Sequence, residues 1–146
     1  RYKKYKDKIT HVVYKNSNTT TPNAWIHENA QRNYLLEGIN HLPDDAWVML
    51  GDVDEILRPE TLQKLRQEES RQVVAMRMPY FNFKFNYMLV NSKEKYCVWS
   101  IACKKQCLTS PQAIRSLRKS LSKLPYNFND DKKIIKVLKD IIKSQQ

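Results

Sequence analysis

The chain has 146 residues, 41% of them hydrophobic, which is about one domain's worth with a modest core of its own. Its formal net charge of +11 is carried by the ends, because residues 1–10 and 104–146 together hold +12 and the 93 residues between them hold −1. This distribution favours two solvated basic faces over a nucleic-acid groove. The lack of a run of roughly 20 apolar residues, or of a signal-peptide segment, predicts a soluble chain without a membrane span.

The first half of the chain alternates short apolar runs with helical periodicity. ITHVVY at residues 9–14 is short and β-branched, which predicts a strand. Residues 22–39 show helical spacing, with a proline at the start and a glycine near the end. AWVML at residues 46–50 is a continuous apolar run, which predicts a strand buried on both faces of a parallel sheet. A second helix is expected over residues 59–67.

The second half contains further strands and two more helices. Three runs are expected to form a mixed, partly antiparallel region: residues 73–78, 80–90 and 96–103. A helix capped by serine and proline is expected up to Leu121, and residues 130–144 carry isoleucine and leucine on one helical stripe. The pattern predicts an α/β fold, with a core domain over residues 1–122 and a basic amphipathic C-terminal helix over residues 123–146.

Cysteine, histidine and glycine usage excludes several kinds of site. The cysteines, at positions 97, 103 and 107, match neither a CxxC pair nor a zinc knuckle, so buried or idle thiols are expected. The three histidines are isolated and lack metal-ligand spacing. Gly38 and Gly51 are the two glycines of the chain, so no glycine-rich loop is available for phosphates. Phosphate binding would therefore require a metal or basic side chains.

Three carboxylates follow the apolar run directly. In WVMLGDVDEIL, residues 47–57, the acids are Asp52, Asp54 and Glu55. The carboxyl end of a parallel strand is where open α/β sheets bind ligands, and acids two apart in a turn can converge on a hard divalent cation such as Mn²⁺ or Mg²⁺. The alternative is a helix N-cap with a first-turn acid. Three acids beside buried residues repel one another unless a cation is present, so we favour the metal.

Two enzyme classes combine an apolar strand with Asp-x-Asp. In haloacid-dehalogenase-like phosphatases Asp52 would be a nucleophile, but Ile56 stands where a threonine or valine is expected. The later acids, Asp130 and Asp131, follow PYNFN rather than an apolar strand. In nucleotide-sugar-dependent glycosyltransferases both acids serve the metal and the donor. A third alternative is a non-catalytic basic module that binds a polyanion or a partner through its lysine-rich ends.

The context upstream of the acids resembles glycosyltransferase family 17, the family of the bisecting β-1,4-mannosyl-glycoprotein N-acetylglucosaminyltransferase. Residues 23–65 resemble the central segment of that family. The positions that match its pattern are Trp25, Glu28, Gln31, Arg32, Asn33, Gly38, Asp44, Asp45, Asp52, Val53, Asp54, Glu55 and Ile56. Weaker similarity in KYKDKITHVVY, YFNFKFNY and LTSPQAIRS extends it to about residues 4–118.

The resemblance implies a partial GT-A-like, Rossmann-like domain for a UDP-sugar donor, with N-acetylglucosamine or a related sugar transferred to a glycan or glycoprotein. It implies that Mn²⁺ or Mg²⁺ bridges Asp54 and the diphosphate, that Asp52 binds the metal through water or binds the ribose, and that Glu55 supports the loop. Arg32 would orient Asp52 or reach the donor phosphates, or else pair with Glu28 one turn away.

Further donor-binding candidates from the resemblance are Gln31 and Asn33, and Trp25 is interpreted as a core residue more readily than as a sugar platform. No general base for the acceptor hydroxyl can be named. In family 17 a first nucleotide-binding strand would precede residue 1 and a Gly-Trp-His segment would follow LTSPQAIRS. Their absence is compatible with a fragment, a truncated copy or a small enzyme.

The compartment and the assembly depend on which of these the chain is. We expect the cytoplasm for the chain itself and the secretory-pathway lumen for a fragment of a longer, membrane-anchored enzyme. A sheet without the family's first strand would have an unpaired apolar edge, which the C-terminal helix would cover within the chain or across a homodimer.

Overall fold

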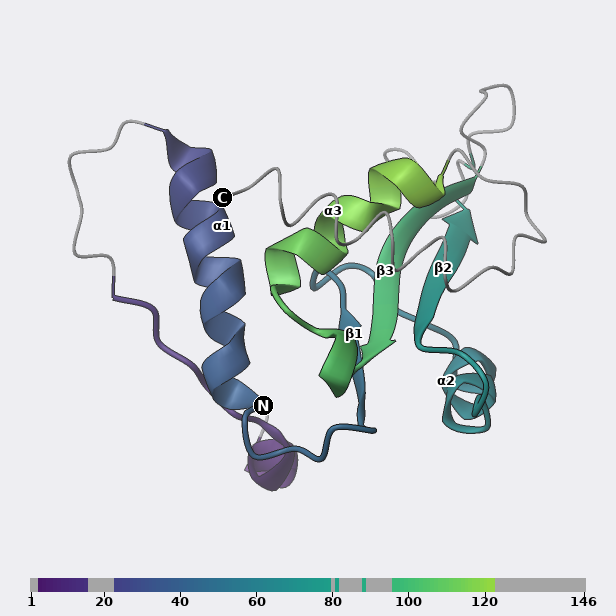
Figure 1. The fold of residues 1–146 in the computed structure, drawn as a ribbon, viewed down its shortest axis with the longest axis horizontal. Helices are drawn as coiled ribbons and strands as arrows, with labels where there is room; N and C mark the ends of the chain where they lie inside the picture. Colours follow the sequence, from purple (N-terminus) through teal and green to yellow (C-terminus); the bar gives the residue numbers. More distant parts are fainter. Residues whose placement is uncertain (1–2, 16–22, 80, 82–87, 89–95, 123–146) are drawn as a thin grey trace.

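A computed structural model of the chain describes residues 3–15, 23–79, 81, 88 and 96–122. Short 3-10 helices are labelled η. In chain order the elements are η1 (Lys3–Lys8), α1 (Ala24–Tyr34), η2 (Leu35–Gly38), β1 (Trp47–Leu50), α2 (Pro59–Arg66), β2 (Val73–Pro79), β3 (Tyr96–Lys104), η3 (Lys105–Cys107) and α3 (Pro111–Leu121). The helix and strand alternation confirms a mixed helix and strand fold (Figure 1).

Within the described residues the sheet has three strands in the order β1-β3-β2, and both pairs are antiparallel. Val48 and Val73 both lie opposite Cys103, so β3 fills the space between two strands that run in the same direction. The expected parallel pairing of residues 46–50 is therefore wrong. The expected burial on both faces is wrong as well, because Val48 is buried while Met49 is 42% exposed. An apolar run of this length does not determine its partner or its direction.

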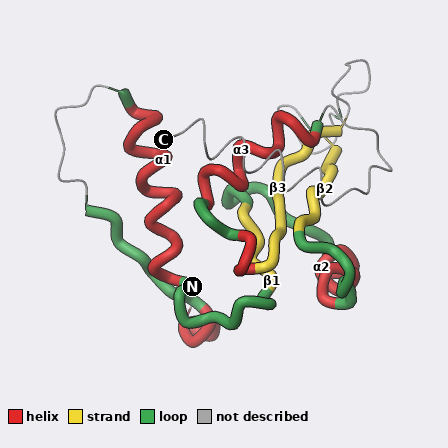
Figure 2. Tube along the Cα trace, viewed as in Figure 1, coloured by secondary structure: helices red, strands yellow, loops and turns green. Residues whose placement is uncertain are grey.

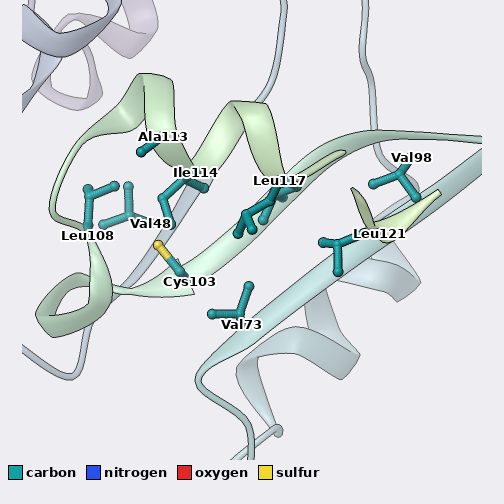
Figure 3. Packing of buried hydrophobic residues seen from close by; sticks show 10 residues of the cluster. Val48, Val73, Val98, Cys103, Leu108, Ala113, Ile114, Leu117 and Leu121 are labelled. Atoms are coloured by element: carbon teal, nitrogen blue, oxygen red, sulfur yellow. The ribbon is translucent and has the colours of Figure 1, made fainter. Parts of the chain in front are cut away.

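Helices cover both faces of this sheet. On one face α3 packs against β1, β2 and β3 with its buried side chains (Figure 3), and Ile114 and Leu117 are fully buried there. On the other face Leu65 of α2 packs against Met76 and Ala102. The core cluster between α3 and the sheet consists of Val48, Val73, Val98, Ile101, Cys103, Leu108, Ala113, Ile114, Leu117 and Leu121. Alternate residues of β3 thus contribute to two different clusters, as the strand geometry requires.

The segment predicted as the first strand lies outside the sheet. Residues 9–15 form no ladder and run as a loop alongside α1 (Figure 2). The rings of Tyr14 and Tyr34 are 5.5 Å apart between centroids, and a Cβ on Gly38 would lie 2.8 Å from Val12 Cγ2. Val12 and Tyr14 therefore pack on the α1–η2 corner while Ile9 and Val13 are exposed, and the strand prediction for residues 9–14 is wrong. The helix predicted over residues 22–39 is confirmed as α1 followed by η2.

Some sequence expectations lie outside the described residues. They include nearly all of residues 80–90, where the described bridge pairs Phe81 with Met88, and the C-terminal helix over residues 123–146. In the described part of the chain, β1 and β2 are the edge strands of the sheet, and no described helix is long and apolar enough to cross a membrane.

Candidate functional site

The acids of the WVMLGDVDEIL segment form a closed turn directly after β1. The Glu55 amide donates to the Asp52 carbonyl at 3.0 Å, and the Asp52 amide donates to Glu55 Oε2, also at 3.0 Å. These reciprocal bonds leave the middle of the turn projecting outward, so that Val53 is 99% exposed and Asp54 is exposed. The turn has the geometry of a loop built to present Asp54 to solvent or to a ligand.

Glu55 is the buried anchor of this turn, with a side chain that is 6% exposed. Its Oε2 accepts hydrogen bonds from the Asp52 amide, from Ser100 Oγ at 3.0 Å and from Arg115 Nη1 at 3.2 Å. Its Oε1 lies 3.1 Å from the same Arg115 nitrogen, although that contact lacks hydrogen-bond geometry. A buried carboxylate is stable only when paired and hydrogen-bonded, and Glu55 meets both conditions.

Arg115 binds two carboxylates at once. Nη1 faces Glu55, and Nη2 donates to Asp52 Oδ2 in a short ion pair. The Arg115 side chain is 6% exposed, whereas Asp52 is 48% exposed. Helix α3 positions this arginine by burying Ile114 and Leu117 beside it. The two forked N–H groups of a guanidinium suit such a bridge.

The sequence prediction did not identify Arg115 as a site residue. One signal was available. Arg115 is the arginine of LTSPQAIRS, one of the stretches that resemble family 17. Helical periodicity did not predict its burial, because a residue directly after Ile114 lies about 100° around the helix axis from it, away from the apolar stripe.

Gly51 allows the loop backbone to approach the buried pair. A Cβ at this position would lie 2.7 Å from Ser100 Oγ and 3.0 Å from Glu55 Oε2. Ser100 itself is fully buried on β3. The register of β3 against β2 shifts there, because Ala75 lies opposite Ile101 and Arg77 lies opposite Val98. Three steps along β3 match two along β2, and such a β-bulge re-aims nearby side chains, here in the stretch that contains Ser100.

Two of the predicted donor-binding residues of α1, Arg32 and Asn33, contact the start of α3. Arg32 Nη2 binds Glu28 Oε1 at 2.5 Å, and Arg32 Nη1 donates to Gln112 Oε1. Asn33 Oδ1 accepts from Ser110 Oγ at 2.8 Å and from the Gln112 amide at 2.9 Å. The i, i+4 pairing of Arg32 with Glu28 is therefore confirmed. In the structure Arg115 binds the Asp52 carboxylate and Arg32 contacts Glu28 and Gln112 instead, and the predicted reach of Arg32 to the donor phosphates stays a prediction.

Two other predicted residues on α1 are exposed. Gln31 is exposed, and the structure gives it no hydrogen bond to any described residue. Trp25 is 69% exposed, so its interpretation as a core residue is wrong. Both side chains are open to a ligand or a partner.

The next question is whether the carboxylates of the turn could bind a divalent cation such as Mg²⁺. Within the described residues no group of three or more histidine, cysteine, aspartate or glutamate side chains is arranged to hold a metal ion. Asp52 has one oxygen on Arg115, and Asp54 has no partner among the described residues. Three acids and one arginine leave a formal charge of −2 at the turn. One or two carboxylates, with water and substrate phosphates, are a common Mg²⁺ environment, so the residues fit a divalent cation.

The family model for glycosyltransferase family 17 matches residues 1–118. The chain belongs to glycosyltransferase family 17. The matched range covers the resemblance over residues 4–118 and includes both the acidic turn and Arg115. No curated protein and no solved structure matches the chain.

Proposed function

We propose that the acidic turn of this family 17 chain is the diphosphate end of a donor site for a UDP-sugar, with UDP-N-acetylhexosamine as the donor class, within a GT-A-like domain. Membership of a glycosyltransferase family supports the general activity. The observation that carries the site is the contrast between two buried or bound acids, Glu55 and Asp52, and the exposed Asp54. Among the described residues Asp54 has no partner, while Asp52 and Glu55 are held in place.

Asp54 would bind Mn²⁺ or Mg²⁺ directly, and Asp52 would contribute the oxygen that Arg115 leaves free, through water or toward the ribose. When bound, the cation would neutralise negative charge on the diphosphate leaving group. Glu55 supports the loop from its buried position, and its bond to the Asp52 amide fixes the spacing of the two aspartates. The chain's own contribution is thus to hold two carboxylates ready for the cation and the donor.

The acceptor in this proposal is a glycan or glycoprotein hydroxyl. Gln31 stays a donor-binding candidate, since it is exposed. Arg32 and Asn33 act by holding α3, from which Arg115 reaches the turn. Arg32 and Asn33 would therefore support the donor site indirectly, by holding the helix that carries Arg115.

A thermal-shift screen of UDP-sugars, with and without Mn²⁺, tests the proposal on the chain as it exists. A ligand that binds only the folded state raises the melting temperature by mass action. UDP-N-acetylhexosamines with Mn²⁺ should give the largest rise, and omission of Mn²⁺ should remove it. A uniform lack of shift across the UDP-sugars with Mn²⁺ would reject the donor site.

A further inference from the structure

We propose that Arg115 is a positioning residue for the acidic turn: by binding Asp52 and Glu55 together it fixes the turn so that Asp54 is free to take the cation. This inference rests on the proposed function, because it concerns the same metal and donor site. The three groups come from different elements, since the acids follow β1 and the arginine lies on α3.

Because the Arg115 side chain is buried, its charge must be neutralised by an acid, but one acid would be enough for that. Arg115 and Glu55 are each 6% exposed and pair with each other, which neutralises both charges away from water. Asp52 is half exposed and could be solvated without any partner. The second contact, from Nη2 to Asp52 Oδ2, therefore goes beyond neutralising Glu55. It links the half-exposed carboxylate to the buried pair and limits where that carboxylate can point.

The positioning role and a purely electrostatic role predict opposite effects on cation affinity. A positive charge beside two metal-binding carboxylates repels a divalent cation, so removing only that charge should tighten Mn²⁺ binding. Loss of positioning should weaken it instead, because a turn that is free to move must be ordered when the cation binds. The sign of the change in the dissociation constant therefore separates the two roles.

The first measurement is the dissociation constant for Mn²⁺ in the presence of UDP, obtained from the free Mn²⁺ signal in electron paramagnetic resonance. Arg115→Gln should weaken binding by about 10-fold or more, the usual effect of losing a group that orients a metal ligand. Arg115→Lys keeps the charge but lacks the fork that reaches both acids, so it should also weaken binding, by less. Arg118→Gln is the matched control on the same helix, because Arg118 stacks on Trp99, and it should leave the constant unchanged.

Tighter or unchanged binding in Arg115→Gln, or wild-type affinity in Arg115→Lys, would overturn the inference. A double-mutant cycle identifies the route of the effect. In an Asp52→Asn background the further loss from Arg115→Gln should largely disappear. If the full loss persists there, Arg115 does not act through Asp52 and the inference is wrong.

Amide hydrogen exchange tests Arg115 without any metal and so separates the inference from the proposed function. The amides of Asp52 and Glu55 close the turn and should exchange faster in Arg115→Gln than in the wild type, while those of β3 stay protected. Equal exchange would overturn the positioning role. A wild-type chain that binds no Mn²⁺ with UDP would refute the proposed function alone. Arg115→Lys replaces the glutamine variant in every comparison if the latter does not fold.

Discussion

The side-chain oxygen of Asn33 on α1 accepts a hydrogen bond of 2.8 Å from the hydroxyl of Ser110, at the start of α3. Ser110 in turn caps α3 by accepting from the Ala113 amide at 3.2 Å. From the same helix Arg115 reaches the acids that follow β1. Helix α3 thus makes polar contacts with two distant parts of the chain, with α1 at its start and with the acidic turn through Arg115.

Asn33→Ala should destabilise the chain by about 1–2 kcal/mol, since it leaves the Gln112 amide at the helix start without its acceptor. The urea midpoint measured by circular dichroism gives this change. The exposed Asn40 serves as the matched control, and Asn40→Ala should leave the midpoint near the wild-type value. An Asn33→Ala chain of wild-type stability would show that the α1–α3 contact contributes nothing.

Gly51→Ala should destabilise the chain by about 1–3 kcal/mol, the usual cost of overpacking. The new methyl would press on Ser100 Oγ and Glu55 Oε2. The combination with Ser100→Ala removes the closest of these atoms, so the double variant should be more stable than the sum of the single changes predicts. Denaturant titration of the wild type, the two single variants and the double variant gives the coupling free energy between the two positions. Strictly additive effects would contradict the close approach of the Gly51 backbone to Ser100.

Cys103 should resist thiol reagents in the folded chain at pH 8. Burial raises the pKa of the Cys103 thiol from 9.0 to about 12, and Cys107 adds to the shift, so the nucleophilic thiolate is scarce. Cys107 is half-buried and should react before Cys103. Iodoacetamide labelling followed by peptide mass spectrometry, with and without urea, measures this order, and rapid native labelling of Cys103 would contradict it.

The same shift has a consequence for stability. Because the pKa of Cys103 is higher in the folded state, the folded chain holds this proton more tightly. The contribution to stability is complete below pH 9.0 and is lost as the pH rises toward about 12. Urea midpoints measured between pH 8 and pH 11 should therefore fall as the pH rises. Midpoints that do not fall across this range would contradict the shift.

The chain should not hydrolyse p-nitrophenyl phosphate with Mg²⁺. An aspartyl-phosphate mechanism needs Asp52 as a nucleophile, and one of its oxygens is bound to Arg115. A colorimetric assay measures turnover, and mass spectrometry after incubation with beryllofluoride detects an adduct. An adduct on Asp52 would favour the phosphatase alternative over the glycosyltransferase.

The sequence placed the acids at the end of a strand correctly, because an apolar run followed by Asp-x-Asp is a local pattern. Helix α1 and the η2 turn after it were also predictable, from the helical periodicity and from Gly38 near the end of the segment. The pairing of residues 47–50 with β3 was not, since a short apolar run is compatible with either direction. The position of residues 9–14 was missed because the β-propensity of a short β-branched run depends on its context and does not determine whether the run joins a sheet.

The pairing of Arg115 with the two acids could not be predicted from the sequence. Its partners Asp52 and Glu55 lie about 60 positions earlier in the chain, and nothing in the local sequence of α3 specifies which acids it meets. Arg32 was the nearer arginine, and its partners turned out to be Glu28 and Gln112. Side-chain pairing across elements depends on the tertiary fold, which periodicity does not determine.

Calorimetric titration of UDP into the chain at saturating Mn²⁺ tests the central claim most directly, with Asp54→Asn and Asp7→Asn as matched variants. Asp7 is exposed on η1, so the Asp7→Asn control should bind like the wild type. The account predicts binding in the wild type and in that control and its loss in Asp54→Asn. Equal binding in the wild type and in Asp54→Asn would contradict the assignment of the cation to this turn.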